Sequence, residues 1–346
     1  MFKIIRRKAQ EIKIKDTILG SDKKIAVQSM LKIKPSDIDG NVSQACELEK
    51  AGCDIVRVAI PTKEDAKLIY KIKNKVNIPV VADIHFDYKI ALESIDAGAD
   101  KIRINPHNID KKHFKKIADT CNFKNIPIRL GFNLGSVMRR SKNADSDLVN
   151  AAIKNIRIFE DLNFRNIVVS LKSSSVLETI GAYEKIAKKC DYPLHVGITE
   201  AGLENTGIVK SSVAIGHLLL KGIGDTIRIS LSGDPIKEVK TGISILQSLN
   251  LYEKRIEIIS CPTCGRTTID VINLTKKIES LVKNIKKNIK IAVMGCPVNG
   301  PGESANADIG ISGASGMGYI FKKGKLIKKT TEDKLIESLL KEIATI

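Results

Sequence analysis

Three cysteines in the last quarter of the chain are spaced like ligands of a metal. Cys261 and Cys264 form a C-x-x-C pair in the segment S-C-P-T-C-G-R-T (260–267), and Cys296 follows in M-G-C-P-V-N-G-P-G-E (294–303). A C-x-x-C pair holds zinc or iron at two points, because the turn between the cysteines directs both sulfurs to one centre. The chemistry that these two segments indicate is therefore metal binding.

The ligands available near these cysteines favour iron over zinc. A closed zinc site takes four Cys or His ligands, but the last histidine is His217, and Glu303 is the only carboxylate within the Gly/Pro-rich second segment. Three thiolates fit a 4Fe–4S cluster in which one iron has no protein sulfur and can take oxygen from Glu303 or from a substrate. The candidate metal ligands are thus Cys261, Cys264, Cys296 and Glu303. A zinc site, or no metal, stays open as an alternative.

Four of the twelve arginines interrupt β-branched runs that are typical of buried strands. They are Arg57 in V-R-V, Arg103 in I-R-I, Arg129 in I-R-L and Arg228 in I-R-I. A charge in a buried strand is costly unless it has a partner, and lysine outnumbers arginine 45 to 12 in this chain. Guanidinium groups make permanently charged, bidentate contacts with phosphate oxygens. The arginines therefore favour a phosphate site over a set of structural ion pairs.

More polar residues lie near the carboxyl ends of these runs, where barrel enzymes place their active sites. Each of them alone would be an ordinary turn or cap residue. Together they describe a strongly cationic pocket that contains a few acids, so we expect a small, multiply anionic ligand, with a diphosphate as the favoured interpretation. The residues are Asp83, His85, Asn105, Asn133, Ser170, Lys172, His195, Thr199, Glu200, Ser230 and Ser232.

The elements that must position these residues repeat eight times. Short β-branched runs alternate with helical stretches such as 147–162, whose apolar residues recur three or four positions apart. This alternation indicates an α/β fold with a parallel sheet, and eight units fit a closed (β/α)8 TIM barrel. A doubly wound open sheet is the alternative. The eight runs are 24–30, 54–60, 79–85, 101–105, 127–133, 166–172, 194–199 and 225–231.

The repeat ends near residue 250, which predicts two domains. We expect a TIM-barrel substrate-binding domain over residues 1–250 and a small α/β domain that binds the cluster over residues 251–346. Within the second domain the sequence predicts a helix over about 269–287, a hairpin turn at 322–325 and a final helix from about 332.

Composition excludes several other classes of protein. The formal net charge of +18 is shared between residues 1–250 (+12) and 251–346 (+6), which argues against a basic nucleic-acid-binding domain or tail. No apolar run reaches the roughly 20 residues of a membrane span, and the first residues lack the apolar core of a signal peptide. We therefore expect a soluble, cytoplasmic protein without a disulfide framework. The four remaining cysteines are expected to be small buried hydrophobes: Cys46, Cys53, Cys121 and Cys190.

The motifs together resemble the bacterial 4-hydroxy-3-methylbut-2-enyl diphosphate synthases of the non-mevalonate isoprenoid pathway. The similarity covers nearly the whole chain, and C-P-T-C-G-R with N-G-P-G-E is its most specific part. It runs through V-Q-S-M near residue 27, V-A-D-I-H-F-D (81–87), I-R-I-N-P (102–106), T-E-A-G (199–202), T-I-R-I-S-L (226–231) and both cysteine segments.

The resemblance implies an iron–sulfur oxidoreductase that opens a ring by reduction. The substrate would be 2-C-methyl-D-erythritol 2,4-cyclodiphosphate, and the product 4-hydroxy-3-methylbut-2-enyl diphosphate, formed with two electrons and the loss of a hydroxyl as water. One 4Fe–4S cluster per chain would be held by Cys261, Cys264 and Cys296, with Glu303 as the catalytic ligand of the fourth iron.

The resemblance also implies roles for the barrel residues. Five basic side chains would clamp the diphosphate with help from Asn105, Asn133 and Ser230, while Asp83 and Glu200 would orient the substrate or the basic side chains. The basic residues are Arg57, Arg103, Arg129, Lys172 and Arg228.

Partners follow from the same resemblance. The chain would form a homodimer in which the cluster domain of one copy covers the barrel mouth of the other. Flavodoxin or ferredoxin would supply the electrons, and neither a nucleic acid nor a membrane is expected to bind. The main alternative is a zinc-stabilised, phosphate-binding barrel synthase without redox chemistry, and a basic nucleic-acid binder with a zinc-ribbon tail is the second.

Overall fold

The computed structural model describes residues 4–137, 143–252, 256–283, 285, 287–296, 302, 305–314 and 316–346. Contacts within the chain divide it into two compact units, Met1–Tyr252 and Glu253–Ile346. We describe each unit by itself. None of the helices in the described ranges is both long and apolar enough to cross a membrane.

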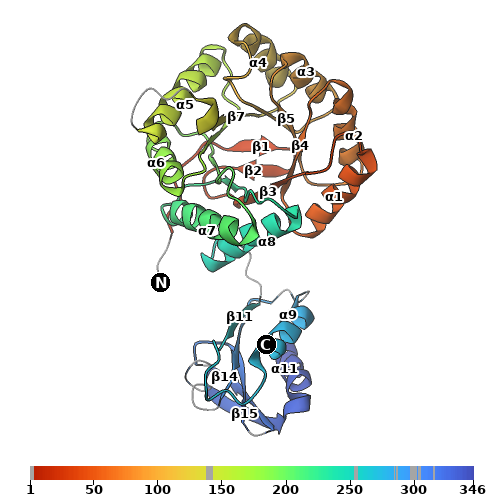
Figure 1. The fold of residues 1–346 in the computed structure, drawn as a ribbon, viewed down its shortest axis with the longest axis vertical. Coiled ribbons are helices and arrows are strands. Elements are labelled where there is room, and N and C mark those ends of the chain that lie inside the picture. The colour runs from red at the N-terminus through yellow and green to blue at the C-terminus, as the bar shows by residue number, and fades with distance from the viewer. Residues whose placement is uncertain are drawn as a thin grey trace. The chain divides into compact units, whose positions relative to one another are not determined.

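The first unit is a barrel of eight parallel strands, as the repeats predicted (Figure 1). Neighbouring strands pair in the order β8-β7-β6-β5-β4-β3-β10-β9. A parallel bridge between Val169 and Leu194 joins β8 to the residue before β9, so the two edges of the sheet meet and the open-sheet alternative is wrong. The strands are β3 (Ala26–Met30), β4 (Ile55–Ala59), β5 (Val80–Ile84), β6 (Lys101–Ile104), β7 (Ile128–Asn133), β8 (Ile167–Lys172), β9 (His195–Val196) and β10 (Thr226–Ile227).

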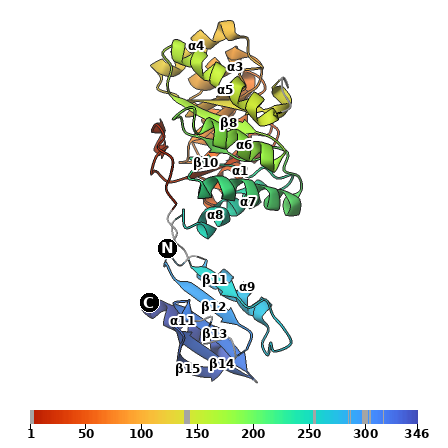
Figure 2. The same cartoon turned by 90° about the vertical axis from the view of Figure 1, so that its left-hand side faces the viewer.

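Helices surround these strands (Figure 2). Local sequence sets where they begin: the carboxylates of Asp37, Asp87 and Asp234 and the hydroxyl of Ser175 accept hydrogen bonds from the first backbone N–H groups of four of them. The helices are α1 (Ile38–Lys50), α2 (Lys67–Lys73), α3 (Tyr88–Asp96), α4 (Phe114–Phe123), α5 (Ala144–Asp161), α6 (Val176–Ile186), α7 (Glu204–Leu220) and α8 (Pro235–Ser248), with short 3-10 turns at Glu64–Ala66, Lys111–His113 and Leu134–Ser136.

A hairpin that the sequence patterns did not predict closes one end of the barrel. Strands β1 (Ile12–Ile14) and β2 (Thr17–Leu19) pair antiparallel and lie across that end in Figures 1 and 2. Their buried side chains form one cluster with residues near the starts of four barrel strands: Ile12, Ile14 and Leu19 with Ala26, Ile55, Val81 and Val168. The amino-terminal end is therefore sealed by apolar packing, and a ligand must enter from the carboxyl end.

The second unit contains a five-stranded sheet, and α9 (Val271–Val282) and α11 (Leu335–Thr345) are the longer helices within its described residues. The first three strands are parallel, and the last three are antiparallel. The predicted hairpin is present, with positive φ angles of 48° at Lys323 and 77° at Gly324, as a tight two-residue turn requires. The predicted first helix is shorter than expected. The elements are β11 (Glu257–Ser260), α9 (Val271–Val282), β12 (Lys290–Met294), β13 (Ile309–Ala314), β14 (Met317–Lys322), β15 (Lys325–Thr331), a 3-10 turn at Glu332–Lys334 and α11 (Leu335–Thr345).

Candidate functional site

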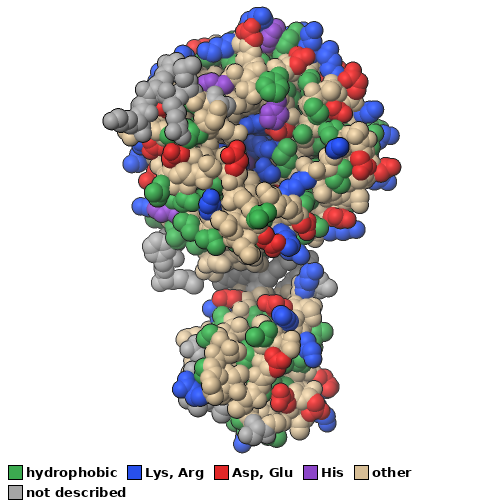
Figure 3. Space-filling view, in the orientation of Figure 1, with side chains coloured by type: hydrophobic (Ala, Val, Ile, Leu, Met, Phe, Trp, Pro, Cys, Tyr) green, Lys and Arg blue, Asp and Glu red, His purple; other side chains and the backbone are tan. Residues whose placement is uncertain are grey.

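Five basic side chains from five of the eight barrel strands face the barrel interior, and we call them the cationic clamp. Lys and Arg side chains gather in the hollow at the centre of the barrel in Figure 3. All five are buried or nearly so, and each stands on a different strand or directly after one. They are Arg57 (β4), Arg103 (β6), Arg129 (β7), Lys172 (β8) and Arg228 (after β10). The structure thus brings together the basic residues that the sequence singled out.

A buried carboxylate holds two members of the clamp in place. Asp83, on β5, accepts a hydrogen bond from Arg103 Nη1 (3.3 Å) and lies 3.7 Å from Arg57 Nη2. His85 Nε2 lies 3.1 Å from Asp83 Oδ2, the oxygen that also faces Arg57. Burial alone would raise the pKa of Asp83, but Arg57, the His85 contact and Arg103 outweigh burial and hold the pKa well below its usual range. Asp83 is therefore ionised and pairs with Arg57 and Arg103, while its role toward a substrate stays a prediction.

Arg129 is the most deeply buried cation of the clamp. Its side chain is 1% exposed, and Nη1 donates a hydrogen bond to Gln28 Oε1 (2.6 Å) on β3. Burial, and then repulsion from Arg57 and Arg103, lowers the pKa of Arg129 well below its ordinary value. A guanidinium nevertheless stays protonated in proteins. The repulsion in the clamp is therefore relieved when an anion binds rather than by loss of a proton from Arg129.

Burial and neighbouring cations also lower the pKa of Lys172 and of Arg57. Burial, followed by Arg228 and Arg129, lowers the pKa of Lys172 well below its ordinary value. Burial also lowers the pKa of Arg57 to about 9, although Asp83 opposes that shift. Buried cations that repel one another form a pre-arranged anion site, because a multiply charged ligand supplies the missing counter-charge.

Glu238 is a part of the site that the sequence did not single out. It lies in the first turn of α8, is 1% exposed, and accepts hydrogen bonds from Ser29 Oγ (2.8 Å) and the Leu231 N–H (3.0 Å). Lys32 Nζ lies 2.8 Å from Glu238 Oε1, and Arg228 Nη2 lies 3.8 Å from Oε2. Glu238 therefore fixes the segment after β10, including Arg228, from behind the strand.

A glycine makes room for Arg103. A Cβ atom at Gly131 on β7 would come within 2.6 Å of Arg103 Nε and 3.2 Å of Ser170 Oγ. Such a contact is too close, so the guanidinium or the hydroxyl would have to move. The missing side chain at Gly131 thus lets Arg103 cross from β6 toward its neighbours.

Four further predicted residues lie at the carboxyl ends of the strands, whereas the predicted His195 is the first residue of β9. Asn105 Oδ1 accepts a hydrogen bond from the His107 N–H (3.1 Å) and holds the turn after β6. Asn133 ends β7, and Ser230 is partly buried in the segment after β10. Glu200 is exposed, with a positive φ of 53°, in the loop after β9. Ligand contact remains a prediction for these four residues.

The two cysteine segments lie on adjacent loops of the second unit. Cys261 directly follows β11, and its N–H donates to the Val293 carbonyl of β12 (2.9 Å). Beyond the C-x-x-C pair, the Thr268 N–H donates to the Gly295 carbonyl (2.9 Å), one residue before Cys296. Parallel pairing of β11 with β12 therefore places both segments at the carboxyl edge of the same sheet.

The three thiols at this edge are not paired in disulfides, and they differ in exposure. Cys296 is buried, Cys261 is partly buried and Cys264 is exposed. Among the described residues, no three His, Cys, Asp or Glu side chains are grouped closely enough to hold a metal ion, and Glu303 lies outside the described residues. In donor chemistry and backbone placement, the three cysteines fit a thiolate-bound iron cluster.

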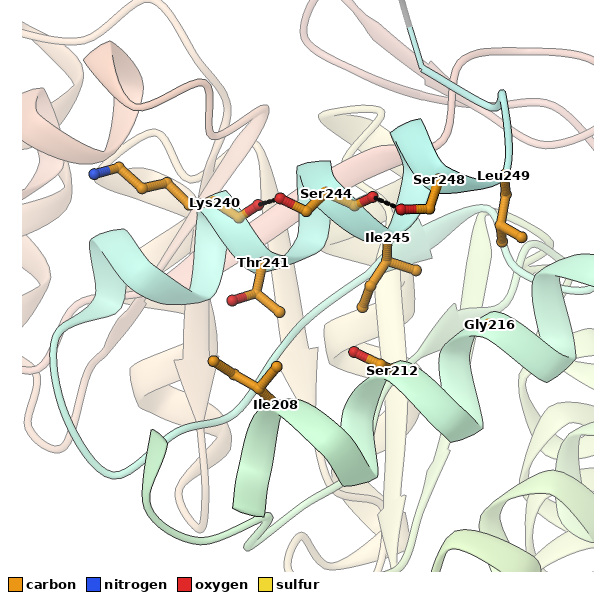
Figure 4. A pocket seen from close by; sticks show the side chains of 9 residues that line it. All are labelled: Ile208, Ser212, Gly216, Lys240, Thr241, Ser244, Ile245, Ser248 and Leu249. Carbon is orange, nitrogen blue, oxygen red and sulfur yellow. Dashed lines mark hydrogen bonds between the residues drawn. The ribbon is translucent and has the colours of Figure 1, made fainter. Parts of the chain in front are cut away.

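A second cavity lies away from the clamp, between α7 and α8 on the outside of the barrel (Figure 4). Its volume is about 450 Å³, and its lining is mostly apolar or hydroxyl-bearing, with Lys240 as the single charged residue. The lining residues are Ile208, Ser212, Gly216, Lys240, Thr241, Ser244, Ile245, Ser248 and Leu249. This cavity lacks the charges that a diphosphate requires, so it is not the predicted site.

Both units match family models. The model described as the GcpE TIM-barrel domain matches residues 9–243, and the model described as the GcpE protein C-terminal domain matches residues 257–345.

Curated proteins similar over their full length carry one name, 4-hydroxy-3-methylbut-2-en-1-yl diphosphate synthase (flavodoxin). The protein of Caldanaerobacter subterraneus subsp. tengcongensis is 50% identical, with 98% of this chain and 97% of that protein covered. That of Clostridium perfringens is 47% identical, with 99% of each covered, and that of Thermotoga petrophila is 49% identical, with 95% and 96% covered.

Solved structures resemble the barrel in fold alone. Dihydropteroate synthase from Stenotrophomonas maltophilia superposes with a TM-score of 0.54 at 13% identity, covering 70% of this chain and 98% of that one. The 7,8-dihydropteroate synthase of Vibrio fischeri gives 0.53 at 13% identity, covering 70% and 99%.

Proposed function

The chain belongs to the GcpE family, and from this premise we propose that its cationic clamp binds 2-C-methyl-D-erythritol 2,4-cyclodiphosphate and that its second unit holds a 4Fe–4S cluster. The reaction is that of the named relatives, the reduction of this cyclodiphosphate to 4-hydroxy-3-methylbut-2-enyl diphosphate in isoprenoid precursor synthesis. The protein is thus an oxidoreductase, and the alternative of a barrel synthase without redox chemistry is set aside.

The observation that carries the substrate proposal is the excess of buried positive charge in the barrel. Five clamp cations are accompanied by two buried carboxylates, Asp83 and Glu238. A cyclic diphosphate brings two further negative charges and several acceptor oxygens to fixed donors, so little reorganisation is needed on binding. Fixed donors also hold the scissile carbon–oxygen bonds in one orientation.

Individual clamp residues divide this work. Arg103 and Arg57 are held by Asp83, and Arg228 is held by Glu238, so these guanidinium groups can keep their orientation as the ligand enters. Arg129 is held from the opposite strand by Gln28. We assign Lys172, Asn105, Asn133 and Ser230 to further contacts with the ligand, and Glu200 to the rim of the pocket.

The cluster proposal rests on the donor set of the second unit. Cys261, Cys264 and Cys296 would hold three irons, and Glu303 would hold the fourth. When bound, such a cluster supplies electrons one at a time and a Lewis-acidic iron for a departing oxygen. Hydrogen bonds from Cys261 N–H and Thr268 N–H to β12 and its following residue fix the two cysteine loops beside each other.

Glu303 can be tested without knowledge of its position. Glu303→Gln keeps the size of the side chain and removes its charge. We expect iron and sulfide contents to match those of the parent protein while turnover falls by more than tenfold. Unchanged turnover would remove Glu303 from the site.

The relatives' names give flavodoxin as the electron donor, and we assign the same carrier here. The +6 formal charge over residues 251–346 favours the approach of an acidic protein.

We also propose a homodimer in which the second unit of one copy covers the barrel mouth of the other. Three exposed apolar side chains that follow barrel strands, in loops or in the first turn of α6, support such a cover: Phe86 (74% exposed), Leu177 (79%) and Leu203 (72%).

The dimer arrangement can be tested by mixing two inactive variants. Arg129→Met disables the barrel, and Cys264→Ser disables the cluster. If the two units act across the dimer, mixed and re-equilibrated chains will regain part of the activity, because one barrel and one cluster remain intact in each hybrid. Activity that stays absent, although hybrids form, would mean that each chain works alone.

The experiment that tests the function itself is an anaerobic assay with reduced flavodoxin. The cyclodiphosphate should be consumed and the open-chain diphosphate should appear, as followed by phosphorus NMR. Arg57→Ala and Arg228→Ala should each weaken binding of the cyclodiphosphate by at least tenfold. Wild-type affinity in both variants would contradict the clamp, and absence of product in the parent protein would contradict the activity.

A further inference from the structure

A buried lysine lies in the barrel beneath the clamp, and none of the roles above uses it. Lys101 is the first residue of β6 and is fully buried. It precedes Arg103 by two positions, so both side chains leave the same face of the strand and enter the barrel interior. Lys101 lies one step nearer to the closed end. Its Nζ makes no hydrogen bond with any described residue.

The groups around Lys101 come from several strands, and none of them neutralises it. Arg57 on β4 and Arg129 on β7 repel its positive form, and His195 on β9 is close enough to be affected by its charge. On the adjacent strand β5, Val81 is its partner in register. The next interior residue of β5 is Asp83, which is engaged by Arg57 and Arg103. Burial first, and then Arg129 and Arg57, lowers the pKa of Lys101 well below its ordinary value.

Other buried polar atoms at the level of Lys101 in the barrel interior also lack a hydrogen-bond partner among the described residues. Gln28 Nε2, Arg129 Nε and His195 Nε2 are buried without a partner among the described residues. The other ring nitrogen of His195 lies 2.6 Å from Thr226 Oγ1. Buried polar atoms are nearly always paired in native proteins, so a group of unpaired nitrogens from four strands indicates a layer that is completed when a ligand binds.

The reaction increases the negative charge of the bound molecule. The cyclic diphosphate is a dianion, whereas the open product ends in a phosphate with one more ionisable oxygen and becomes a trianion near neutral pH. In balance, the dianion takes two electrons from the donor and one proton, and yields the trianion and one water. Two carbon–oxygen bonds break and a carbon–carbon double bond forms. A site that can gain a positive charge matches this change better than one with fixed charges alone.

We propose that Lys101 takes up a proton from solvent when the diphosphate enters the clamp, and that the resulting ammonium group matches the charge of the ligand and product. This inference rests on the proposed function of the barrel. Lys101 adjusts the charge of the site from beneath, and the proton bound to it is additional to the one consumed in forming water. As a consequence, ligand affinity falls as the pH rises from the lowered pKa of Lys101 in the free protein to its higher pKa in the complex, and changes no further above that.

Calorimetry can measure the proton directly. The full-length protein, purified anaerobically and without an electron donor, is titrated with the cyclodiphosphate at pH 8 in buffers of different ionisation enthalpy. The dependence of the binding heat on the buffer gives the number of protons taken up. We expect uptake approaching one proton per chain for the parent protein, both with the substrate and with the open-chain product.

Two neutral variants identify the group. Lys101→Met and Lys101→Gln should both bind with little or no proton uptake and with at least tenfold lower affinity at pH 7. Lys73→Met removes a lysine that pairs with Asp100 (2.6 Å) away from the clamp and should leave uptake unchanged. His195→Gln tests the other unpaired base of the layer, and uptake should persist in that variant.

The possible failures can be distinguished. If the parent protein does not bind the cyclodiphosphate at all, the proposed function is wrong. If the parent binds without proton uptake, or if uptake persists in a folded Lys101 variant, or if it disappears only in His195→Gln, the inference about Lys101 is wrong while the function stands. Should both Lys101 variants fail to fold, an affinity of the parent protein for the cyclodiphosphate that does not fall as the pH rises would still overturn it.

Discussion

The barrel interior and the cysteine edge of the second unit hold their chemical groups in different ways. The clamp residues stand on strands, are buried, and are oriented by Asp83, Gln28 and Glu238. The cysteines stand on loops after strands, and the thiol of Cys264 is exposed. On the proposed function, the phosphate site would be formed before its ligand arrives, whereas the cluster site would be completed by the metal, as is common for metal-bound loops.

The largest effect should come from removing a thiol, because this change should abolish the function of one site and leave ligand binding at the other intact. Cys264→Ser should abolish cluster binding and product formation, while affinity for the cyclodiphosphate stays within about twofold of the parent value because the barrel is a separate unit. Iron analysis and calorimetry measure the two quantities. Cys46→Ser, in α1, is the control and should retain the cluster. Loss of cyclodiphosphate binding in Cys264→Ser would mean that the barrel site depends on the metal.

A substitution in the barrel should have the opposite effect, with loss of ligand binding and retention of the cluster. Arg129→Met replaces the most buried clamp cation by an apolar side chain and leaves Gln28 Oε1 without its donor. We expect about 100-fold weaker binding of the cyclodiphosphate with a full complement of iron. Arg157→Met, an exposed arginine on α5, should change neither quantity. Iron loss in the Arg129 variant would contradict the independence of the two sites.

A smaller effect is expected when a positioning residue is changed. Glu238→Gln keeps the shape but removes the charge that faces Arg228 and Lys32. We expect KM to rise by about tenfold with a smaller change in kcat, since the segment after β10 loses its anchor. Glu204→Gln, which breaks an exposed pair with Lys237, should leave KM unchanged. Equal changes in the two variants would indicate a general loss of stability instead.

The smallest effect concerns the space beside Arg103. Gly131→Ala places a methyl group against Arg103 Nε, so the guanidinium must shift and affinity should fall by about threefold. Gly135→Ala adds the same methyl group where nothing lies within 4 Å and serves as the matched control. Unaltered affinity in both variants would show that Arg103 does not need its present position.

The sequence predicts the clamp because strand topology determines where alternate residues point. Arginines within β-branched runs can only face the interior or the helices, and the four arginines converge with Lys172 once the barrel closes. Glu238 could not be recognised in the same way. An acid in the first turn of a helix is ordinary, and only the fold shows that this turn lies behind Arg228.

Other elements carried no usable signal. Strands β1 and β2 are three residues each, too short for an alternating pattern to be recognised. Lys101 was included in a predicted strand, but its burial among cations depends on contacts from β4, β7 and β9, which are distant in sequence. Asn105 was predicted to contact the ligand, and its side chain also holds the turn after β6, a role that needs coordinates to detect.

The most direct test of the whole account uses protein that is purified anaerobically. Its iron, sulfide and zinc contents are measured, and its EPR spectrum is recorded after reduction with dithionite. We predict about four irons and four sulfides per chain, and a reduced-cluster signal that changes when the cyclodiphosphate is added, because the proposed dimer would bring the bound ligand to the iron. Zinc without sulfide, or a cluster signal indifferent to the cyclodiphosphate at saturating concentration, would contradict the account.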